Sequence, residues 1–218
     1  ESVYAAGALD FYGKNGSIRA ENCRTCKHTK ECPFYFDIMR DRTMVDLYVE
    51  NEKYDGYLRD GCVFKNDVNI FDKMAATIKY ANGVQVAYSL TAYSPYEGYR
   101  IASNGTKGRI DAWIEESKPT SDKNYDEIVL FKNFSRREYI HVPFAASGHG
   151  GGDKLLKDQI FLPEIGDPFK QCANVRDGAL ACLVGIAARN SIASKAPVNI
   201  ADLTSIKPKA VKEYKRIL

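Results

Sequence analysis

Apolar and polar residues alternate along the first two thirds of the chain, with the period of two that is typical of β-strands. The clearest alternation runs over residues 76–80 and 84–90, and the pair Asn82-Gly83 lies between these arms. Asn-Gly flanked by alternating apolar residues is a strong hairpin signal, because both residues tolerate positive φ. The pattern therefore predicts a β-hairpin centred on Asn82-Gly83.

The same alternation predicts further strands. Residues 3–11 read as an opening strand, and residues 99–114 read as a second hairpin that turns at Asn104–Gly108. Two later strands are expected at 127–131 and 137–144. Residues 40–60, which are charged and rich in tyrosine, are expected to form a surface excursion.

In the last third the apolar period changes to that of a helix. Asp153 is placed to cap a helix whose apolar face carries Leu155, Leu156 and Ile160. Residues 175–194 carry five apolar residues at helical spacing, which predicts a helix packed on something large. Strands followed by helices indicate the α+β class: an open, mainly antiparallel sheet with helices on one face. We expect a single domain over residues 1–218.

Composition excludes several classes of function. Apolar residues make up 44% of the chain, charged residues 27%, and the net charge is +3. The basic residues are scattered among the acidic ones, which argues against nucleic-acid binding. No apolar run approaches the about 20 residues of a membrane span. The chain does not open with methionine, and we expect it to be part of a longer, cytoplasmic protein.

Cysteines form one candidate metal site. Cys23 and Cys26 are separated by two residues, and this spacing lets both thiolates face one ion. Cys32 can be a third ligand, and His28 and Cys62 are the candidates for the fourth. The spacing favours a structural zinc site, and four protein ligands would leave no open position for catalysis.

Other interpretations of the cysteines stay open. The chain has six cysteines, an even number, so reduced thiols or disulfides are alternatives to a metal. Cys182 is expected on the apolar face of the 175–194 helix, where a free cysteine behaves as a small hydrophobe. Cys172 likewise falls outside the metal pattern.

The run Gly148–Asp153, with the sequence GHGGGD, is the other candidate for chemistry. An esterase-type oxyanion hole would also need G-x-S-x-G, which does not occur. A dinucleotide fingerprint would need a third glycine where Asp153 stands. Two interpretations remain: a tight strand-to-helix connection with His149 incidental, or a loop whose backbone and His149 line a sugar or polyol pocket.

Five segments, in order through nearly the whole chain, resemble the C-terminal domain of the Gfo/Idh/MocA family, which is named for glucose–fructose oxidoreductase, inositol 2-dehydrogenase and rhizopine catabolism. These segments are CRTC…ECPFYFD, DGCVFKNDVNIFDKM, NGVQVAYSLTAYSPYEGYRIASNGTKGRID, SGHGGGDKLL and RDGALACLVGIAARNSIASKAPVNIADL. The resemblance implies a glyceraldehyde-3-phosphate-dehydrogenase-like α+β domain that covers the substrate and mediates oligomerisation. In that family a separate Rossmann domain binds NAD or NADP and carries the catalytic lysine, so no catalytic or cofactor-binding residue is assigned here.

The resemblance also implies roles for particular residues. It matches the cysteines to a four-cysteine pattern, which promotes Cys62 over His28, and it places the glycine loop at the substrate cleft. Tyrosine faces and an arginine fork suit hydroxyl-rich ligands, although Tyr93 more simply covers a sheet edge. The expected substrate-binding residues are His149, Gly150, Gly151, Gly152, Tyr99 and Arg100, and the expected zinc ligands are Cys23, Cys26, Cys32 and Cys62.

The implied activity is hydride transfer between nicotinamide and a carbinol carbon of a sugar, cyclitol or related polyol. The implied partners are this substrate, the enzyme's own Rossmann domain and a second copy docked on the sheet face. We expect the 218 residues alone to be inactive. The alternative is a non-enzymatic, zinc-stapled α+β module that binds carbohydrate or protein.

Overall fold

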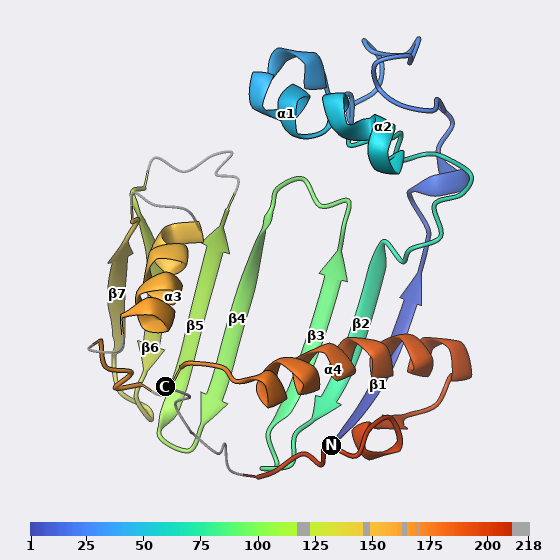
Figure 1. The fold of residues 1–218 in the computed structure, drawn as a ribbon. Helices are drawn as coiled ribbons and strands as arrows, with labels where there is room; N and C mark the ends of the chain where they lie inside the picture. The colour runs from blue at the N-terminus through green and yellow to red at the C-terminus, as the bar shows by residue number, and fades with distance from the viewer. Residues whose placement is uncertain (117–122, 146–148, 163–164, 170, 211–218) are drawn as a thin grey trace. The chain divides into compact units, whose positions relative to one another are not determined.

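The structure, a computed structural model, describes residues 1–116, 123–145, 149–162, 165–169 and 171–210. The chain forms two compact units (Figure 1). Of the described residues, unit 1 comprises Glu1–Tyr93 and residues 179–210, and unit 2 comprises those within Ser94–Gly178. Each unit contains one four-stranded antiparallel sheet.

The sheet of unit 1 has the strand order β3-β2-β1-β8. Its strands are β1 (Ser2–Ala8), β2 (Lys73–Lys79), β3 (Gln85–Thr91) and the short β8 (Val198–Asn199). Every pairing is antiparallel. This confirms the predicted opening strand and the predicted hairpin.

The hairpin turn, a three-residue loop between the paired Tyr80 and Val84, uses positive φ at Gly83 but not at Asn82. Gly83 has φ +86°, and its N–H donates to the carbonyl of Tyr80 at 3.0 Å. Asn82 keeps a negative φ, and its side-chain oxygen accepts the N–H of Val84 at 3.1 Å. The two residues therefore serve the turn differently: glycine by backbone freedom, asparagine by a side-chain hydrogen bond.

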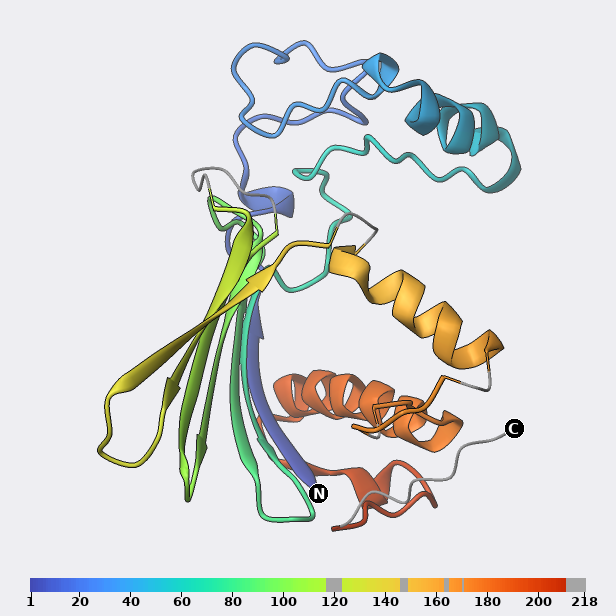
Figure 2. The ribbon, with the colours of Figure 1, turned by 90° about the vertical axis from the view of Figure 1, so that its left-hand side faces the viewer.

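Helix α4 (Val175–Ser194) packs on one face of this sheet from Ala179 onward (Figure 2). The buried centre of the core is Val3, Ala187 and Ile200. The apolar helix residues that pack around it are Leu180, Leu183, Val184 and Ala188. The predicted bounds of this helix and its buried face are confirmed.

The chain between β1 and β2 is mostly irregular and lies beyond one end of these strands (Figure 2). It holds the short helices α1 (Arg42–Leu47) and α2 (Glu52–Asp55). Its 3₁₀ turns are Gly13–Asn15, Ile38–Arg40 and Val49–Asn51, and a further 3₁₀ turn at Ile200–Asp202 follows β8. All four cysteines of the candidate metal site lie in this segment between β1 and β2.

The sheet of unit 2 is a meander with the order β4-β5-β6-β7. Its strands are β4 (Gly98–Gly105), β5 (Gly108–Glu115), β6 (Tyr125–Phe131) and β7 (Arg137–Pro143). A 3₁₀ turn at His149–Gly151 leads into helix α3 (Gly152–Phe161). The second predicted hairpin and the two later strands are thus confirmed.

The two faces of the unit 2 sheet differ in chemistry, because side chains alternate across each strand. The row Ile101, Ala112, Ile128 and Ile140 crosses all four strands on one face. The neighbouring row, on the opposite face, is Arg100, Trp113, Glu127 and His141. One face is therefore aliphatic, and the other is charged and aromatic.

The α+β class with open antiparallel sheets is confirmed, although the strands form two sheets where one was expected. The expectation of a single domain stays a prediction. Among the described residues, no helix combines the length and the apolarity that crossing a membrane requires.

Two local predictions for α3 were wrong, and so was one for α4. Gly151, in a left-handed conformation, is the N-cap of α3, and Asp153 lies inside the first turn, where its carboxylate bonds to His149. The three apolar residues expected on the buried face of that helix, Leu155, Leu156 and Ile160, are each more than half exposed. Cys182 is exposed, so it is not a hydrophobe of the α4 core.

Candidate functional site

The glycine–histidine loop has three consecutive residues in the left-handed region. His149, Gly150 and Gly151 have φ values of +47°, +62° and +91°. Left-handed backbone strains a residue that carries a Cβ, so the histidine is held there at a cost of about 1–2 kcal/mol. Gly148 of the same run lies outside the described residues.

An aspartate one helical turn later orients the imidazole of His149. Nδ1 of His149 lies 2.9 and 3.0 Å from the two carboxylate oxygens of Asp153. The side chain of His149 is 86% exposed, so Nε2 faces outward. The hydrogen bond to Asp153 raises the pKa of His149, the charge of Asp153 raises it further, and Glu116 adds to the same effect. The carboxylate thus fixes which ring nitrogen is offered to an incoming group.

The three glycines of the loop are explained to different degrees. Gly150 and Gly151 need positive φ, which glycine adopts without strain. Gly152 has no positive φ, and a Cβ added to it would have no neighbour within 4 Å among the described residues. The fold therefore gives no reason for a glycine at position 152.

Tyr99 and Arg100 are adjacent on β4, so their side chains leave opposite faces of the sheet. Tyr99 pairs with Ile114 on the aliphatic face. Arg100 lies on the charged face, with its guanidinium carbon 4.2 Å from the ring centroid of Trp113. The two residues expected to bind substrate together are therefore not brought together.

Arg100 and Trp113 line the larger of the two described pockets, a shallow hollow of about 1250 Å³ on the charged face. Arg109, Asp111, Tyr125 and Glu127 line it as well. Trp113 was not a candidate from the sequence, where a lone tryptophan in an alternating strand reads simply as a sheet residue. Its pairing with Arg100 could have been inferred only from the register of the two strands.

The four candidate zinc ligands surround a second, smaller pocket. Cys23, Cys26, Cys32 and Cys62 all line one cavity of about 140 Å³ in unit 1. His28 does not line it, and its imidazole pairs instead with Glu31 at 3.2 Å. The geometry therefore favours Cys62 over His28 as the fourth member of the set.

Burial raises the pKa of the Cys23 thiol. A backbone hydrogen bond from Phe36 lowers it in part, and the charges of Asp60, Cys62 and Cys32 raise it again. None of the six cysteines forms a disulfide, so the disulfide interpretation does not describe this structure. In the part of the chain that is described, no group of three or more His, Cys, Asp or Glu side chains is arranged to hold a metal ion. The thiols would have to close on an ion to bind it.

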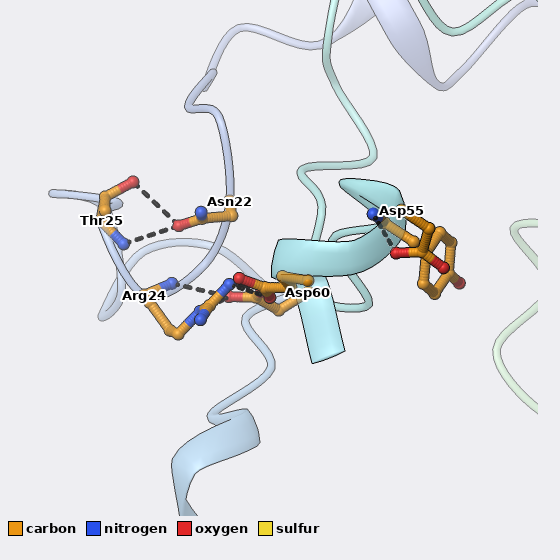
Figure 3. Close-up of polar contacts among 7 residues, drawn as sticks. Asn22, Arg24, Thr25, Asp55 and Asp60 are labelled. Atoms are coloured by element: carbon orange, nitrogen blue, oxygen red, sulfur yellow. Dashed lines mark hydrogen bonds and ion pairs between the residues drawn. The ribbon is translucent and has the colours of Figure 1, made fainter. Parts of the chain in front are cut away.

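Several polar residues around the cysteines were missed from the sequence. Arg24 forms an ion pair with the buried carboxylate of Asp60, and Asn22 organises the turn between Cys23 and Cys26 (Figure 3). Arg24 and Asp60 are 36 residues apart, so no local pattern reveals the pair.

The chain is similar to a protein of Bacillus subtilis (strain 168) named "Putative oxidoreductase YteT". The two sequences are 32% identical over 221 residues, which is 93% of this chain. The chain spans about half, 51%, of the length of that relative. No protein-family model matches the chain. No solved structure matches it either.

Proposed function

We propose that this chain is the substrate-facing part of an NAD(P)-dependent oxidoreductase of the Gfo/Idh/MocA type, acting on a sugar, cyclitol or related polyol. The similarity to a protein named as an oxidoreductase supports the reaction class. That protein is about twice as long, which leaves room for a cofactor domain elsewhere in the enzyme. In this chain Asp153 replaces the third glycine of a dinucleotide loop, so we place the nicotinamide outside these residues.

The observation that carries the proposal is the loop His149–Gly152. Asp153 holds Nδ1 of His149, and Nε2 is left to bond a substrate hydroxyl. The missing side chain of Gly152 has no reason within the fold, and it leaves the backbone open to a ligand. We therefore assign His149 and Gly152 to substrate binding.

The chemistry divides between this chain and the rest of the enzyme. Bound nicotinamide would accept or donate the hydride at the carbinol carbon. His149 would hold the hydroxyl of that substrate, and the glycine loop would let the sugar ring approach the backbone. This chain would contribute orientation, and the proton-transfer base would lie outside it.

The test uses the complete enzyme with a panel of sugars and cyclitols and with NAD⁺ or NADP⁺, followed by the absorbance of the reduced nicotinamide. His149→Gln should raise KM about fivefold with a smaller change in kcat, because a lost binding hydrogen bond is worth about 1 kcal/mol. His141→Gln is the matched control, since His141 is likewise an exposed histidine that faces a carboxylate, Glu127. No hydride transfer with any substrate would refute the proposed activity.

A second measurement separates the enzyme from the alternative binding module. The 218 residues alone should bind neither NAD⁺ nor NADP⁺ in isothermal titration. Micromolar nucleotide binding by this chain would overturn the division of roles. Sugar binding by a complete protein that shows no hydride transfer would favour the module.

We also propose that the four thiols hold a structural zinc ion. Their chemistry fits, because zinc prefers tetrahedral thiolate ligands and all four line one cavity. Zinc would crosslink parts of the chain between β1 and β2 that are far apart in the sequence, and it would take part in no reaction step. Elemental analysis after purification without chelators should find about one zinc per chain.

Self-association through a sheet face is the remaining proposal. On the aliphatic face of unit 2, Ile101 and Ile140 are 55% and 45% exposed. Such side chains are the kind that a second copy would cover. Light scattering should find a dimer or larger oligomer, and Ile140→Glu should shift it toward the monomer. A clean monomer of the unmodified protein at high concentration would refute this proposal.

A further inference from the structure

An ion pair between the buried Asp60 and Arg24, whose side chain is 21% exposed and also pairs with Glu52, joins the two chain segments that carry the cysteines. The side chain of Asp60 is fully buried, with 0% of its surface exposed. The guanidinium of Arg24 donates to both of its oxygens, from Nε and Nη2, at 3.0 Å each. The backbone N–H of Arg24 donates to Oδ2 at 3.0 Å as well (Figure 3). One carboxylate therefore holds both the backbone and the side chain of the residue next to Cys23.

The same two segments also form a short antiparallel bridge. Asn22 faces Gly61 in this bridge. The N–H of Cys23 donates to the carbonyl of Asp60 at 2.8 Å, and the N–H of Cys62 donates to the carbonyl of Glu21 at 3.1 Å. Cys23 and Cys62 are thus fixed against each other, because each donates a backbone bond to the residue two positions before the other cysteine.

Further bonds shape the turn that carries Cys26. The side-chain oxygen of Asn22 accepts both the N–H and the hydroxyl of Thr25 at 2.9 Å (Figure 3). The N–H of Cys26 donates to the carbonyl of Cys23 at 3.2 Å. The N–H of His28 donates to Sγ of Cys26 at 3.3 Å, a bond that strengthens when the sulfur carries negative charge.

Stability alone is a poor explanation for a buried charge such as that of Asp60. Taking an ion out of water costs several kcal/mol, and well-packed apolar residues often stabilise a fold equally well. The best-supported use of such a group is to fix one register among several. Here the register that is fixed is that of Cys23 against Cys62.

We infer that Arg24 and Asp60 are positioning residues for a four-thiol metal site: they hold the two cysteine segments in register, so that the thiols need only close on the ion. This inference rests on the zinc site proposed above. It concerns residues that are not metal ligands, in the layer of hydrogen bonds that orients ligands and typically controls metal affinity by about 10- to 100-fold.

The test is a titration of the full chain, stripped of metal, with Co²⁺ and then Zn²⁺. Tetrahedral thiolate ligation of Co²⁺ gives visible absorption bands, and competition with a chromophoric chelator gives the affinities. Asp60→Asn should weaken Co²⁺ and Zn²⁺ binding about 10- to 100-fold. Arg24→Lys, which keeps the charge and loses the paired donors, should weaken it in the same direction.

The matched control is Asp72→Asn. Asp72 is another buried aspartate of unit 1, 1% exposed, and it accepts the backbone N–H groups of Phe11 and Tyr12, which are not cysteine neighbours. If weaker binding came only from a less stable unit 1, this variant would show it too. Circular dichroism of each variant before metal is added monitors folding. If Asp60→Asn does not fold, Arg24→Lys decides the question.

The outcomes separate the two proposals. An unmodified chain that binds neither metal refutes the zinc site, and the positioning role with it. Tight binding that neither Asp60→Asn nor Arg24→Lys weakens leaves the zinc site in place and overturns the positioning role. Equal weakening by Asp60→Asn and Asp72→Asn also overturns that role. Weakening confined to the Arg24 and Asp60 variants, with an altered cobalt spectrum, supports it.

Discussion

The hydroxyl of Ser191 in α4 accepts the backbone N–H of Ala5 in β1 at 2.9 Å. The same hydroxyl donates to the carbonyl of Ala196 at 2.7 Å, and Ser191 is 0% exposed. Along the edge of β1 that faces β8, the two strands pair only at Ser2 and Val3. The side chain of Ser191 therefore satisfies the N–H of Ala5, which would otherwise be buried without a partner.

Replacing Ser191 with alanine should therefore destabilise unit 1. Ser191→Ala leaves the Ala5 N–H buried and unsatisfied, which costs about 1–3 kcal/mol. Urea denaturation should show the loss as a lower midpoint with an unchanged slope. Ser194→Ala, at an exposed position of the same helix, should change the free energy of unfolding by less than about 0.5 kcal/mol.

Asp72 should make the stability of unit 1 depend on pH. Burial by itself raises the pKa of this carboxyl, but the N–H groups of Asp10, Tyr12 and Phe11, with that of Asp72 itself, outweigh burial and lower it below the ordinary 3.8. A carboxyl whose pKa is lowered by folding contributes stability above its unfolded pKa and loses it as the pH falls through the folded pKa.

Denaturation of the wild type and of Asp72→Asn at several pH values checks this. At neutral pH the variant should be less stable by about 2 kcal/mol, since hydrogen bonds to a charged group are lost. The gap should narrow as the pH falls below about 4, because the carboxyl of the unfolded chain becomes protonated there and that of the folded protein only at lower pH. A gap that stays constant down to about pH 2 would contradict the explanation.

Two glycines should respond in opposite ways to alanine. Gly83 has φ +86°, and a Cβ added there would meet nothing within 4 Å, so Gly83→Ala should cost about 1–2 kcal/mol through the backbone alone. Gly152, in the first turn of α3, has ordinary φ and equally open surroundings, so Gly152→Ala should be neutral or slightly stabilising.

Thermal unfolding measures both effects, and kinetics of the complete enzyme separate them from function. Gly152→Ala should raise KM for the substrate although the fold tolerates it. An unchanged KM would remove Gly152 from the proposed site.

Asp153→Asn should lower the pKa of His149. The raised pKa comes first from the hydrogen bond to Asp153 and then from its charge, and a neutral amide removes the charge and weakens the bond. An NMR titration of the imidazole signals would show the shift directly, with His141 as the internal reference. Glu116→Gln should move the same pKa by a smaller amount.

Strands and helices could be predicted where the pattern that indicates them lies within a short stretch of the sequence. The alternation around Asn82-Gly83 and the helical period of residues 175–194 each depend on residues close in the chain, and both elements lie where they were predicted. The predicted cap of α3 was wrong because the helix begins one residue before Asp153. Gly151 is the N-cap, and the carboxylate of Asp153 bonds to His149 instead.

What could not be predicted depends on distant partners. Ser191 sits in an apolar helix and reads as a weak helix former until Ala5 is placed beside it. In the sequence Asp60 and Asp72 resemble ordinary surface acids, yet both are buried. The hydrogen-bond donors of Asp60 lie 36 residues away, and those of Asp72 lie 60–62 residues away. For the candidate site, the residues of the glycine loop and the thiol set were predictable, but the separation of Tyr99 from Arg100 needed the strand register.

Unit 2 is an insertion in the sequence of unit 1, and this has a consequence for synthesis. Ala5 and Ser191 are 186 residues apart, so β1 leaves the ribosome long before the helix that covers it. At a synthesis rate of about 5–20 residues per second, the apolar face of β1 stays uncovered for roughly 10–40 s. The hairpin β2-β3 can pair with β1 during that time. The partly synthesised chain that chaperones would bind is therefore a sheet that its helix does not yet cover.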